Sequence, residues 1–481
     1  MPHITIIGGG FAGVEAAWAA ANRGCTVTLY EMRPNRQTAV HKTSDLAELV
    51  CSNSFKSNLL TNAAGVLKEE MRRLGSLILP IAARHSVPAG EALAVDREPF
   101  SREVTEAIDA HPNITIIREE VTELPAGRPL IIATGPLTSE ALAPHIQSLT
   151  GADALYFYDA VAPTVTLESL DMSKVFRASR RGRGSGLEAL NWGMGESESG
   201  GDGEVNGEAV DAPDVAEQKG CAVNPVESAD YLNCPLNKEE YFALYEALLT
   251  AEQSISHNPD DEKIIYFEMC MPVEEIARRG PRTLAFGPMK PVGLDDPRTG
   301  RWPYAVVQLR QENKDGTLWG LVGFQTRLKW PEQKRVFRLI PGLENAEFVR
   351  YGVMHRNTYV NAPTVLDLNM QVKSSPGVFL AGQMTGVEGY LESAAIGILA
   401  GINAARVACD LKPVSPPRES ALGSLCAYLT ETEPKRFAPM NANFGIMPEL
   451  PQKIRDKRER ARLKGEIALK AIDRFILNNG L

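Results

Sequence analysis

The pattern of apolar and polar positions in the first thirty residues predicts a strand, a helix and a second strand in quick succession. Residues 3–7 (HITII) are a short apolar run with β-branched side chains, and residues 25–30 form a second run that ends at Glu31. A glycine-rich turn, GGGFAG, and an alanine-rich segment, Val14–Asn22, lie between them. The order strand, G-x-G-x-x-G, helix, strand, acid is typical of a dinucleotide-binding unit.

Each part of this unit has a physical role. The first glycine of the motif, Gly8, allows a tight turn, Gly10 lets the backbone approach a pyrophosphate, and Gly13 lets helix and strand pack closely. The helix N-terminus directs unpaired N–H groups at the phosphates, and Glu31 can accept hydrogen bonds from ribose hydroxyls. We therefore predict an adenine dinucleotide here; a structural glycine turn and an S-adenosylmethionine site are the alternatives. The predicted contacts are Gly8, Gly9, Gly10, Phe11, Ala12, Gly13 and Glu31.

A second unit of the same kind lies near the other end of the chain. A strand at residues 378–380 runs into a glycine-rich turn at 381–390, and a helix rich in small residues follows from Leu391 to about Cys409. An apolar strand at residues 130–133 also ends at Thr-Gly. Two such units that bracket an inserted domain indicate a glutathione-reductase-type FAD domain, since an NAD dehydrogenase does not need the late unit. The further predicted FAD contacts are Thr134, Gly135, Gly382, Gln383, Gly386, Gly389 and Tyr390.

We therefore predict an α/β fold with four parts. The FAD-binding Rossmann domain comprises residues 1–170 and 345–412, a mixed α/β substrate domain is inserted at 171–344, and 413–481 form a helical C-terminal region. Within the insert, residues 193–220 contain seven glycines, eight acids and one base. Such a composition buries too little apolar surface to order itself, so we predict disorder there.

Composition narrows the cellular setting. The 481 residues carry a net charge of −9, and the seven cysteines include no C-x-x-C pair. This pattern predicts neither a disulfide framework nor a metal site and favours a reducing cytoplasm. We expect no signal peptide and no membrane span, because no apolar run approaches the roughly 18 residues that a span needs.

Several stretches together resemble one known family. They include LAELVCSNSFKSN, PAGEALAVDREPFS, DYLNCPLNKEEY, LAFGPMKPVGL and FLAGQMTGVEGYLESAAIGILAGINAAR. The chain resembles the TrmFO family of folate- and FAD-dependent tRNA (uracil-5-)-methyltransferases over its whole length, apart from about residues 182–229.

The resemblance implies a reaction. A methylene group from 5,10-methylenetetrahydrofolate becomes the C5 methyl of the T-loop uridine, position 54, of tRNA. Reduced FAD supplies the electrons, and NADPH or NADH reduces it again. No protein partner is implied. The alternative enzymes are an FAD-dependent wobble-uridine modification protein similar to MnmG and another flavin oxidoreductase, although a disulfide reductase would need a redox cysteine pair. A protein that binds RNA and uses FAD only structurally is a third interpretation.

The chemistry of uracil requires an activated thiol. C5 becomes nucleophilic after a group adds at C6, and a thiolate does this well. Both Cys234 (YLNCPL) and Cys51 match functional cysteines of the family. Cys51 follows a short run, residues 45–50, that we predict to be helical. We assign Cys234 as the uracil nucleophile and expect Cys51, with Lys56 nearby to lower its pKa, to act beside the flavin. The two assignments can also be reversed.

Other candidate contacts are less specific. His355 and Arg356 precede the late flavin unit and could stack on and hydrogen-bond the folate, while Arg97 and Lys290 are candidate anion-binding residues. For each of them a structural role is the default. Basic stretches that could contact tRNA phosphates lie at residues 177–183, 327–338 and 453–464, and phosphate contacts would make binding sensitive to salt.

Overall fold

The computed structural model describes residues 1–481 except 39, 152–154, 181–229, 255–265 and 267–270. The side chains of residues 155–159 and 355–356 also fall outside the described part. The insert at residues 193–220, which we predicted to be disordered, lies outside the described residues.

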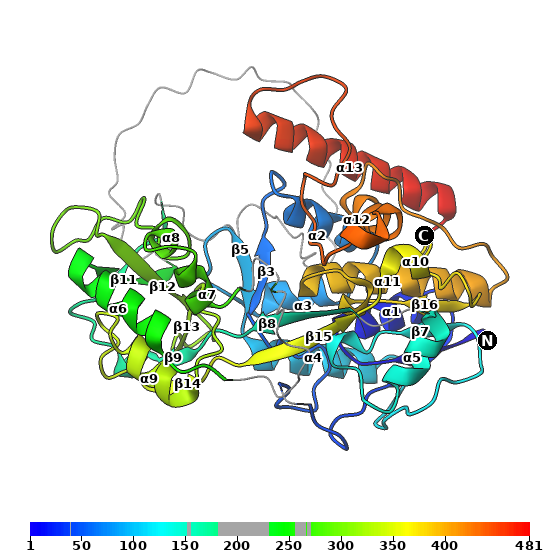
Figure 1. The fold of residues 1–481 in the computed structure, drawn as a ribbon. Helices are drawn as coiled ribbons and strands as arrows, with labels where there is room; N and C mark the ends of the chain where they lie inside the picture. Colours follow the sequence, from blue (N-terminus) through cyan, green and yellow to red (C-terminus); the bar gives the residue numbers. More distant parts are fainter. Residues whose placement is uncertain (39, 152–154, 181–229, 255–265, 267–270) are drawn as a thin grey trace, which may run out of the picture.

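The centre of the first domain is a five-stranded parallel sheet that contains both glycine-rich units (Figure 1). The strand order is β16-β7-β1-β2-β6, so the late strand joins the early ones in one sheet through β7. The bounds are β1 His3–Ile7, β2 Thr26–Tyr30, β6 Ile114–Ile117, β7 Leu130–Ile132 and β16 Val378–Leu380. The predicted α/β fold with a parallel Rossmann-type sheet is confirmed.

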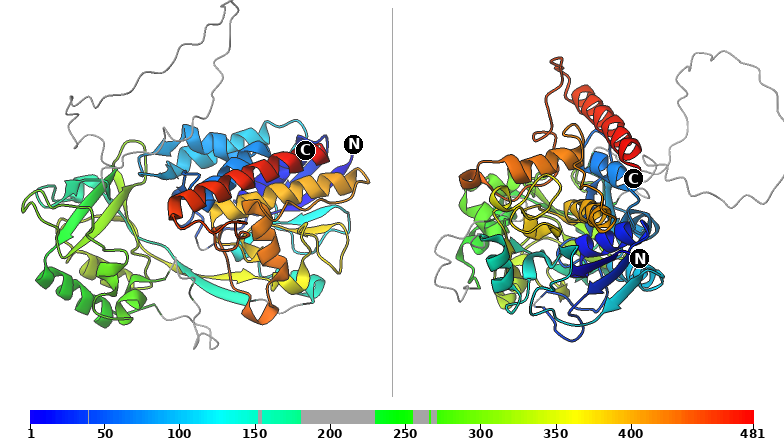
Figure 2. Two further views of the ribbon diagram at one scale, coloured as in Figure 1. Left: turned by 90° about the horizontal axis from the view of Figure 1, so that it is seen from above. Right: turned by 90° about the vertical axis from the view of Figure 1, so that its right-hand side faces the viewer.

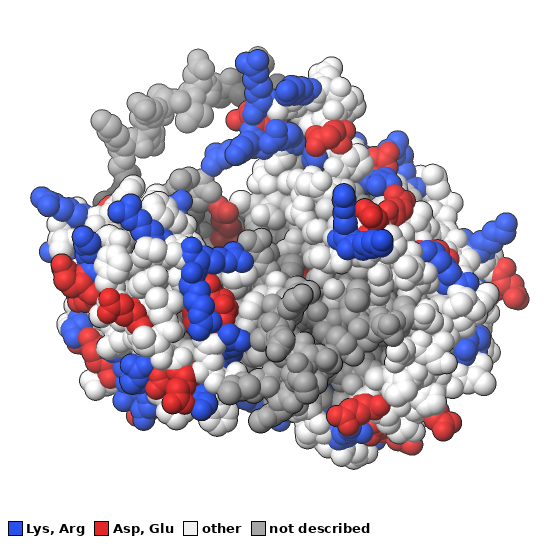
Figure 3. All heavy atoms as spheres, viewed as in Figure 1, with Lys and Arg blue, Asp and Glu red and all other residues white. Residues whose placement is uncertain are grey.

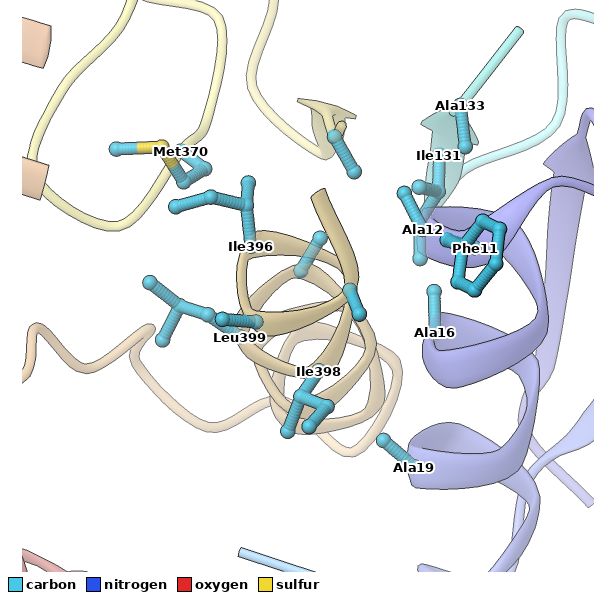
Figure 4. Close-up of a cluster of buried hydrophobic side chains, with 14 of the residues drawn as sticks. Phe11, Ala12, Ala16, Ala19, Ile131, Ala133, Met370, Ile396, Ile398 and Leu399 are labelled. Atoms are coloured by element: carbon cyan, nitrogen blue, oxygen red, sulfur yellow. The ribbon is translucent and has the colours of Figure 1, made fainter. Parts of the chain in front are cut away.

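Two helices, α1 (Phe11–Ala21) and α11 (Tyr390–Ala408), follow the two glycine-rich turns and pack on each other. Figure 4 shows Ala12, Ala16 and Ala19 of α1 directed at α11. On α11, a Cβ atom at Gly397 would lie 2.2 Å from the carbonyl oxygen of Ala12, and one at Gly401 would lie 2.4 Å from that of Ala16. Only glycine permits so close an approach of two helix backbones, and this approach brings the two turns together.

A smaller antiparallel sheet and three helices complete one side of this domain. The sheet has the order β3-β5-β4 (Ser54–Ser57, Ala92–Val95, Ser86–Val87), and the helices are α2 Ala63–Arg73, α3 Ile78–Arg84 and α4 Arg97–Asp109. The segment 45–50, for which we predicted a helix, forms turns instead. Its amides bond outside the segment: Leu46 N donates to Thr105 Oγ1 and Ala47 N to Gly9 O.

The inserted domain is built on a six-stranded antiparallel sheet of order β10-β11-β12-β13-β9-β14. The strands are β9 Thr164–Thr166, β10 Phe176–Arg177, β11 Tyr231–Leu236, β12 Ala305–Gln311, β13 Leu318–Leu321 and β14 Phe348–Arg350. The helices of this domain are α6 Lys238–Thr250, α7 Val273–Arg278, α8 Thr283–Phe286 and α9 Trp330–Phe337. β9 and β14 therefore extend this sheet beyond the predicted bounds 171–344.

The two domains are joined by the antiparallel pair β8 (Leu155–Ala160) and β15 (Met354–Tyr359), which runs between them in Figure 1. The remaining helices are α5 Ala143–Thr150, α10 Ala362–Val365, α12 Ala421–Glu431 and α13 Lys457–Asn479. Figure 2 shows α13 lying along the first domain, with the C-terminus close to the N-terminus. The C-terminal region is thus helical, as predicted, and α13 packs on α2.

One helix departs from the expectation that no apolar run reaches the length of a membrane span. α11 has 19 residues, and an 18-residue window within it has a mean hydropathy of 1.3, so by length and composition alone this helix could cross a membrane. However, 78% of that window is buried inside the protein. α11 is the core helix of the FAD-type domain, and its small residues serve the contact with α1.

The contact between α1 and α11 can be tested at Gly397. Because Gly397→Ala places a methyl group against the backbone of Ala12, we expect the free energy of unfolding to fall by about 1–3 kcal/mol or more. Urea denaturation measures this change. Gly127→Ala is the control, because Gly127 is exposed and a Cβ added there would have no atom within 4 Å. Equal stability of the two variants would contradict the packing described.

Candidate active site

A cavity of about 430 Å³ lies where the two glycine-rich turns, the loop after residue 50 and the inserted sheet meet. Both glycine-rich units contribute to its wall, as does the Thr-Gly end of β7. Of the predicted FAD contacts, those that line it are Gly8, Gly9, Gly10, Phe11, Ala12, Glu31, Thr134, Gly135, Gly382, Gln383, Gly389 and Tyr390. Gly13 and Gly386 do not line the cavity.

The early turn has the form that a pyrophosphate needs. Gly8 has φ of +106°, and a Cβ on Gly13 would lie 1.8 Å from the carbonyl oxygen of Gly8. Gly13 therefore serves the packing of helix on turn. In contrast, a Cβ added at Gly10 would have no atom within 4 Å, so the backbone there faces open space at the start of α1, where helix N–H groups favour an anion.

Glu31 lies at the end of β2 on the cavity wall and is held in place by neighbours. Its Oε2 accepts a hydrogen bond from Gly9 N (3.0 Å), and its Oε1 accepts from Arg33 N and Nε (3.0 and 2.9 Å). Burial alone would raise the pKa of Glu31, but Arg33 and these bonds outweigh it and hold the pKa below its usual range. A carboxylate has about four acceptor positions, so one remains for a ribose hydroxyl.

The late turn brings an uncommon backbone conformation to the opposite wall. Gly382 and Gly389 have φ of +81° and +121°, and a Cβ on Gly382 would lie 2.9 Å from Cβ of Ala12. Gln383 Nε2 donates to Glu388 Oε2 at 2.9 Å. The two turns therefore approach each other closely enough to hold one extended ligand between them.

Cys51 faces the cavity and is held by Tyr390, the first residue of α11. The Tyr390 hydroxyl donates to Cys51 Sγ at 2.9 Å and accepts from Cys51 N at 2.7 Å. Burial, followed by the charge of Cys51, raises the pKa of Tyr390 well above its usual value. The ring of Tyr390 lies 4.7 Å from that of Phe11 between centroids. The thiol is thereby fixed to both dinucleotide units at once.

The loop that carries Cys51 has two further anchors. The guanidinium of Arg97 donates to the carbonyl oxygens of Leu49 and Cys51 (2.9 and 2.8 Å) and to Glu312 Oε2 (2.6 Å). The buried Asn53 side chain bonds the carbonyl oxygens of Val95 and Gln311. Arg97, a predicted anion-binding residue, thus lines the cavity but has its donors engaged by the protein.

Lys56 has a different role from the one expected. We expected it to activate Cys51, but its Nζ forms an ion pair with the buried Glu392 at 2.6 Å and bonds Glu388 O at 3.3 Å. Arg97 is a cation that does interact electrostatically with the thiol, and its pKa lies above its usual value because Glu312, Tyr390 and Cys51 together outweigh the effect of its burial.

Cys234, which we predicted to be the uracil nucleophile, does not reach the cavity. It lies in β11, in the extended conformation expected before Pro235, but its side chain is fully buried in the apolar core of the inserted domain. In a strand, successive side chains point to opposite faces, and Leu232 and Leu236 share the core face with Cys234. Burial raises the pKa of the Cys234 thiol far above its usual value. As placed, this thiol is neither exposed nor activated.

The remaining predicted contacts are only partly placed. His355 and Arg356 lie on β15, opposite Asp159 and Tyr158 of β8, and their side chains lie outside the described part. Lys290 is exposed in a turn and does not line the cavity.

The cavity also has a polar wall that we did not predict, made by Arg310 and Glu312. In the run VVQLRQE the polar residues Gln308, Arg310 and Glu312 alternate with Val307 and Leu309 of the core. This period of two is visible in the sequence. The sequence does not show, however, that the polar face of this strand lies against the first domain.

The predicted basic stretches differ in how many charges they leave unpaired. In 327–338, Arg327, Lys329 and Arg335 pair with acids at 2.6–2.8 Å. At 453–464, Arg462 pairs with Glu459 and Glu466, and Lys464 is buried. Among the described residues, four exposed bases at the start of α13 have no acidic partner: Lys453, Arg455, Lys457 and Arg458. Figure 3 shows basic side chains gathered near the start of α13.

Comparison with known proteins identifies the family. A protein of Symbiobacterium thermophilum, described as methylenetetrahydrofolate–tRNA-(uracil-5-)-methyltransferase TrmFO, is 56% identical over 97% of this chain and 96% of its own length. A protein of Heliobacterium modesticaldum with the same description is 54% identical over 99% of this chain and 98% of its own length. The chain belongs to the TrmFO family. The resemblance stated from the sequence is confirmed.

Two other comparisons agree with the fold. The model of the family described as glucose inhibited division protein A matches residues 3–200 and 185–412 of this TrmFO-family chain. The crystal structure of Aquifex aeolicus GidA, form II, is similar with a TM-score of 0.64 at 18% identity, over 99% of this chain and 76% of that one. At this identity the likeness shows the fold alone.

The different placement of the two thiols predicts different reactivity. We expect iodoacetamide to alkylate Cys51 in the native protein at least tenfold faster than Cys234, because Cys234 is fully buried and its pKa is raised. Peptide mass spectrometry resolves each site, and the exposed Cys409 is an internal reference. Both thiols should react equally once the chain is unfolded. Fast labelling of Cys234 in the native protein would contradict its placement.

The Tyr390 hydroxyl can be tested by Tyr390→Phe. This change removes a hydrogen-bond donor to the sulfur of Cys51, and such a bond stabilises a thiolate. We therefore expect alkylation of Cys51 at neutral pH to slow severalfold, with the fastest rate reached only at higher pH. Tyr428→Phe, which removes a hydroxyl that bonds Ala438 O away from the cavity, should leave the rate unchanged. An unaltered rate in Tyr390→Phe would rule out this role.

Proposed function

We propose that the protein catalyses folate-dependent C5 methylation of a uridine in tRNA, with FAD bound in the cavity described above. Members of its family carry this activity in their name. The observation that carries the proposal is the meeting of both dinucleotide-type turns and the Cys51 thiol at one cavity.

The residues of the cavity fit FAD. The open space at Gly10 and the N-terminus of α1 suit a pyrophosphate, and Glu31 has an acceptor position for a ribose hydroxyl. The late turn at Gly382–Tyr390 places the second helix N-terminus, that of α11, at the other wall. When bound and reduced, FAD supplies the electrons that turn a methylene into a methyl group, and we infer that NADPH or NADH restores the reduced form.

The protein's own contribution is to position a thiol. We infer that Cys51 takes part in the covalent step, since it is the thiol that lines the cavity within the described part of the chain. Tyr390 and Arg97 hold it in place and favour its anionic form, because the tyrosine donates a hydrogen bond to the sulfur and the arginine carries a positive charge. The aromatic group of Phe11, Phe55 and Phe100 excludes water behind the loop.

The carbon donor is 5,10-methylenetetrahydrofolate and the acceptor is the T-loop uridine, position 54. A base inside folded RNA has to leave its stack to reach such a cavity. The unpaired bases at the start of α13 are suited to contact tRNA phosphates. A tRNA substrate and a reducing cytoplasm are consistent with each other, and no protein partner is required by this scheme.

The alternatives explain the site less well. A disulfide reductase needs a second thiol beside Cys51, and within the described residues Cys25, Cys234 and Cys426 are buried elsewhere and Cys409 is exposed at the end of α11. A flavin protein that only binds RNA leaves the double hydrogen bond between Tyr390 and Cys51 without a purpose.

Replacement of Cys51 tests the proposal. We expect Cys51→Ala to lower the rate of ribothymidine formation from labelled methylenetetrahydrofolate and tRNA by about 10³-fold or more, as loss of a covalent catalyst does. Flavin absorbance should be retained, because neither glycine-rich turn is altered. Cys426→Ala, a buried thiol on α12, is the control and should keep its activity. Full activity of Cys51→Ala would refute the proposed role.

The same assay bears on Cys234. If Cys234→Ala retains methylation activity, Cys234 has only a structural role in the core of the inserted domain. Loss of methylation with FAD content and stability intact would mean that β11 has to open during the reaction.

A further inference from the structure

The part of the cavity wall formed by Arg97, Arg310 and Glu312 carries two positive charges and one negative charge. Within the described part of the chain, four Lys and Arg side chains line the cavity: Arg33, Lys56, Arg97 and Arg310. Three of them are neutralised by direct ion pairs, Arg33 with Glu31 and Glu48, Lys56 with Glu392, and Arg97 with Glu312, at 2.6–3.0 Å. Arg310 differs, because its Nη2 lies 4.0 Å from Glu312 Oε1.

Arg310 has donors to spare. Its Nε is buried and has no hydrogen-bond partner within the described part of the chain, and 17% of its side chain is exposed. Glu312 cannot satisfy it fully, because Oε2 of that carboxylate accepts both bonds from Arg97. An unpaired buried guanidinium N–H is costly unless a ligand completes it.

A further guanidinium, that of Arg350 at the end of β14, does not line the cavity but interacts electrostatically with Arg97 and Glu312, which do. Arg350 is half-buried, and its Nη1 has no hydrogen-bond partner among the described residues. Burial and the neighbouring Arg97 lower the pKa of Arg350, while Glu312 and Tyr390 act in the opposite direction. Arg97, Arg310 and Arg350 thus share the carboxylate of Glu312, so this wall suits an oxyanion.

The wall lies at the thiol end of the cavity. A chain of contacts runs from the carbonyl oxygen of Cys51 to Arg97, from Arg97 to Glu312, and from Glu312 to Arg310. The sheet itself fixes the orientation, since Arg310 pairs with Tyr231 and Gly320 while its neighbour Leu309 lies in the core. A ligand that reaches Cys51 therefore comes close to Arg310.

We propose that Arg310, supported by Arg350, binds a backbone phosphate that flanks the uridine that is methylated. This inference rests on the proposed function. A nucleotide joins its base to this phosphate through a single ribose, so a base at the thiol end brings the phosphate with it. The carboxylates of the folate lie at the far end of that molecule from its one-carbon unit, which makes them the less suitable partner. Arg310 is thus a residue that positions the substrate, and it selects a nucleotide in a chain over a free base.

A double-substitution experiment tests the assignment. The FAD-loaded protein, as wild type and Arg310→Met, is titrated with T-arm RNA hairpins that carry either normal phosphates or a single neutral methylphosphonate, placed 5′ or 3′ of the target uridine. We expect Arg310→Met, and the methylphosphonate at one of these two positions, each to weaken binding by about tenfold or more, the usual range for a charge-assisted contact. The two changes together should weaken binding no further, because they remove the same contact. Arg310→Met should also reduce the slope of log K against log salt by about one.

Controls separate the possible outcomes. Arg301→Met, an exposed arginine of the same domain, should respond to the methylphosphonate as the wild type does. Tetrahydrofolate affinity, measured by its effect on flavin absorbance, should be unchanged in Arg310→Met; a loss confined to folate would overturn the assignment in favour of the folate carboxylates. Additive losses, or a wild type indifferent to the methylphosphonate at either position, would also overturn it.

Because the methylphosphonate arm uses wild-type protein, a folding defect in Arg310→Met cannot imitate the expected result. If the wild type forms no ribothymidine at all, the proposed function fails, whereas an active wild type without coupling refutes this inference alone.

Discussion

The close contact between α1 and α11 is the constraint on which the site depends. Each helix follows a glycine-rich turn at the end of a parallel strand, and the two helices come from opposite ends of the chain. A side chain at Gly397 or Gly401 would strike the backbone of α1. Because these positions are glycine, the two turns face one cavity. With larger residues the same elements would form, but the turns would lie further apart and could not hold one dinucleotide.

The position of the Cys51 thiol depends on that contact as well. Cys51 belongs to a loop with little regular structure, and such loops position a side chain only when other elements hold them. Here Tyr390 from α11, Arg97 from α4 and Asn53, which bonds β12, supply the anchors. Phe11 of α1 packs on Tyr390. The position of the thiol is therefore set jointly by the early unit, the late unit and the inserted domain.

Much of the fold could be predicted from the sequence, because local patterns with strict spacing determine the strands and turns of the first domain. The strands 3–7 and 378–380 and the glycine-rich turns are specified by neighbouring residues, and they lie where they were expected. The segment 45–50 was not a helix, since its amides bond to Gly9 and Thr105, and such distant partners leave no trace in a local pattern.

The two cysteines show the same limit within the site. YLNCPL and CSNSFKS both contain a cysteine that matches a functional cysteine of the family. Cys234 is buried because strand parity turns it toward Leu232 and Leu236, and parity alone does not say which face is covered. In the same way, the local pattern does not single out the acids near the two cations. Lys56 pairs with Glu392. The acid near Arg310 is Glu312, which already pairs with Arg97. Charge pairing between residues far apart in the sequence decides which cations stay available, and it is visible only in three dimensions.

We infer that the Cys51 thiol lies beside a flavin held between the two turns. The most direct measurement is the absorbance of the FAD-loaded protein as the pH is raised, because a thiolate next to an oxidised flavin gives a long-wavelength charge-transfer band. The band should appear in the wild type, vanish in Cys51→Ala and persist in Cys234→Ala. A band that survives in Cys51→Ala, or that disappears only in Cys234→Ala, would contradict the account.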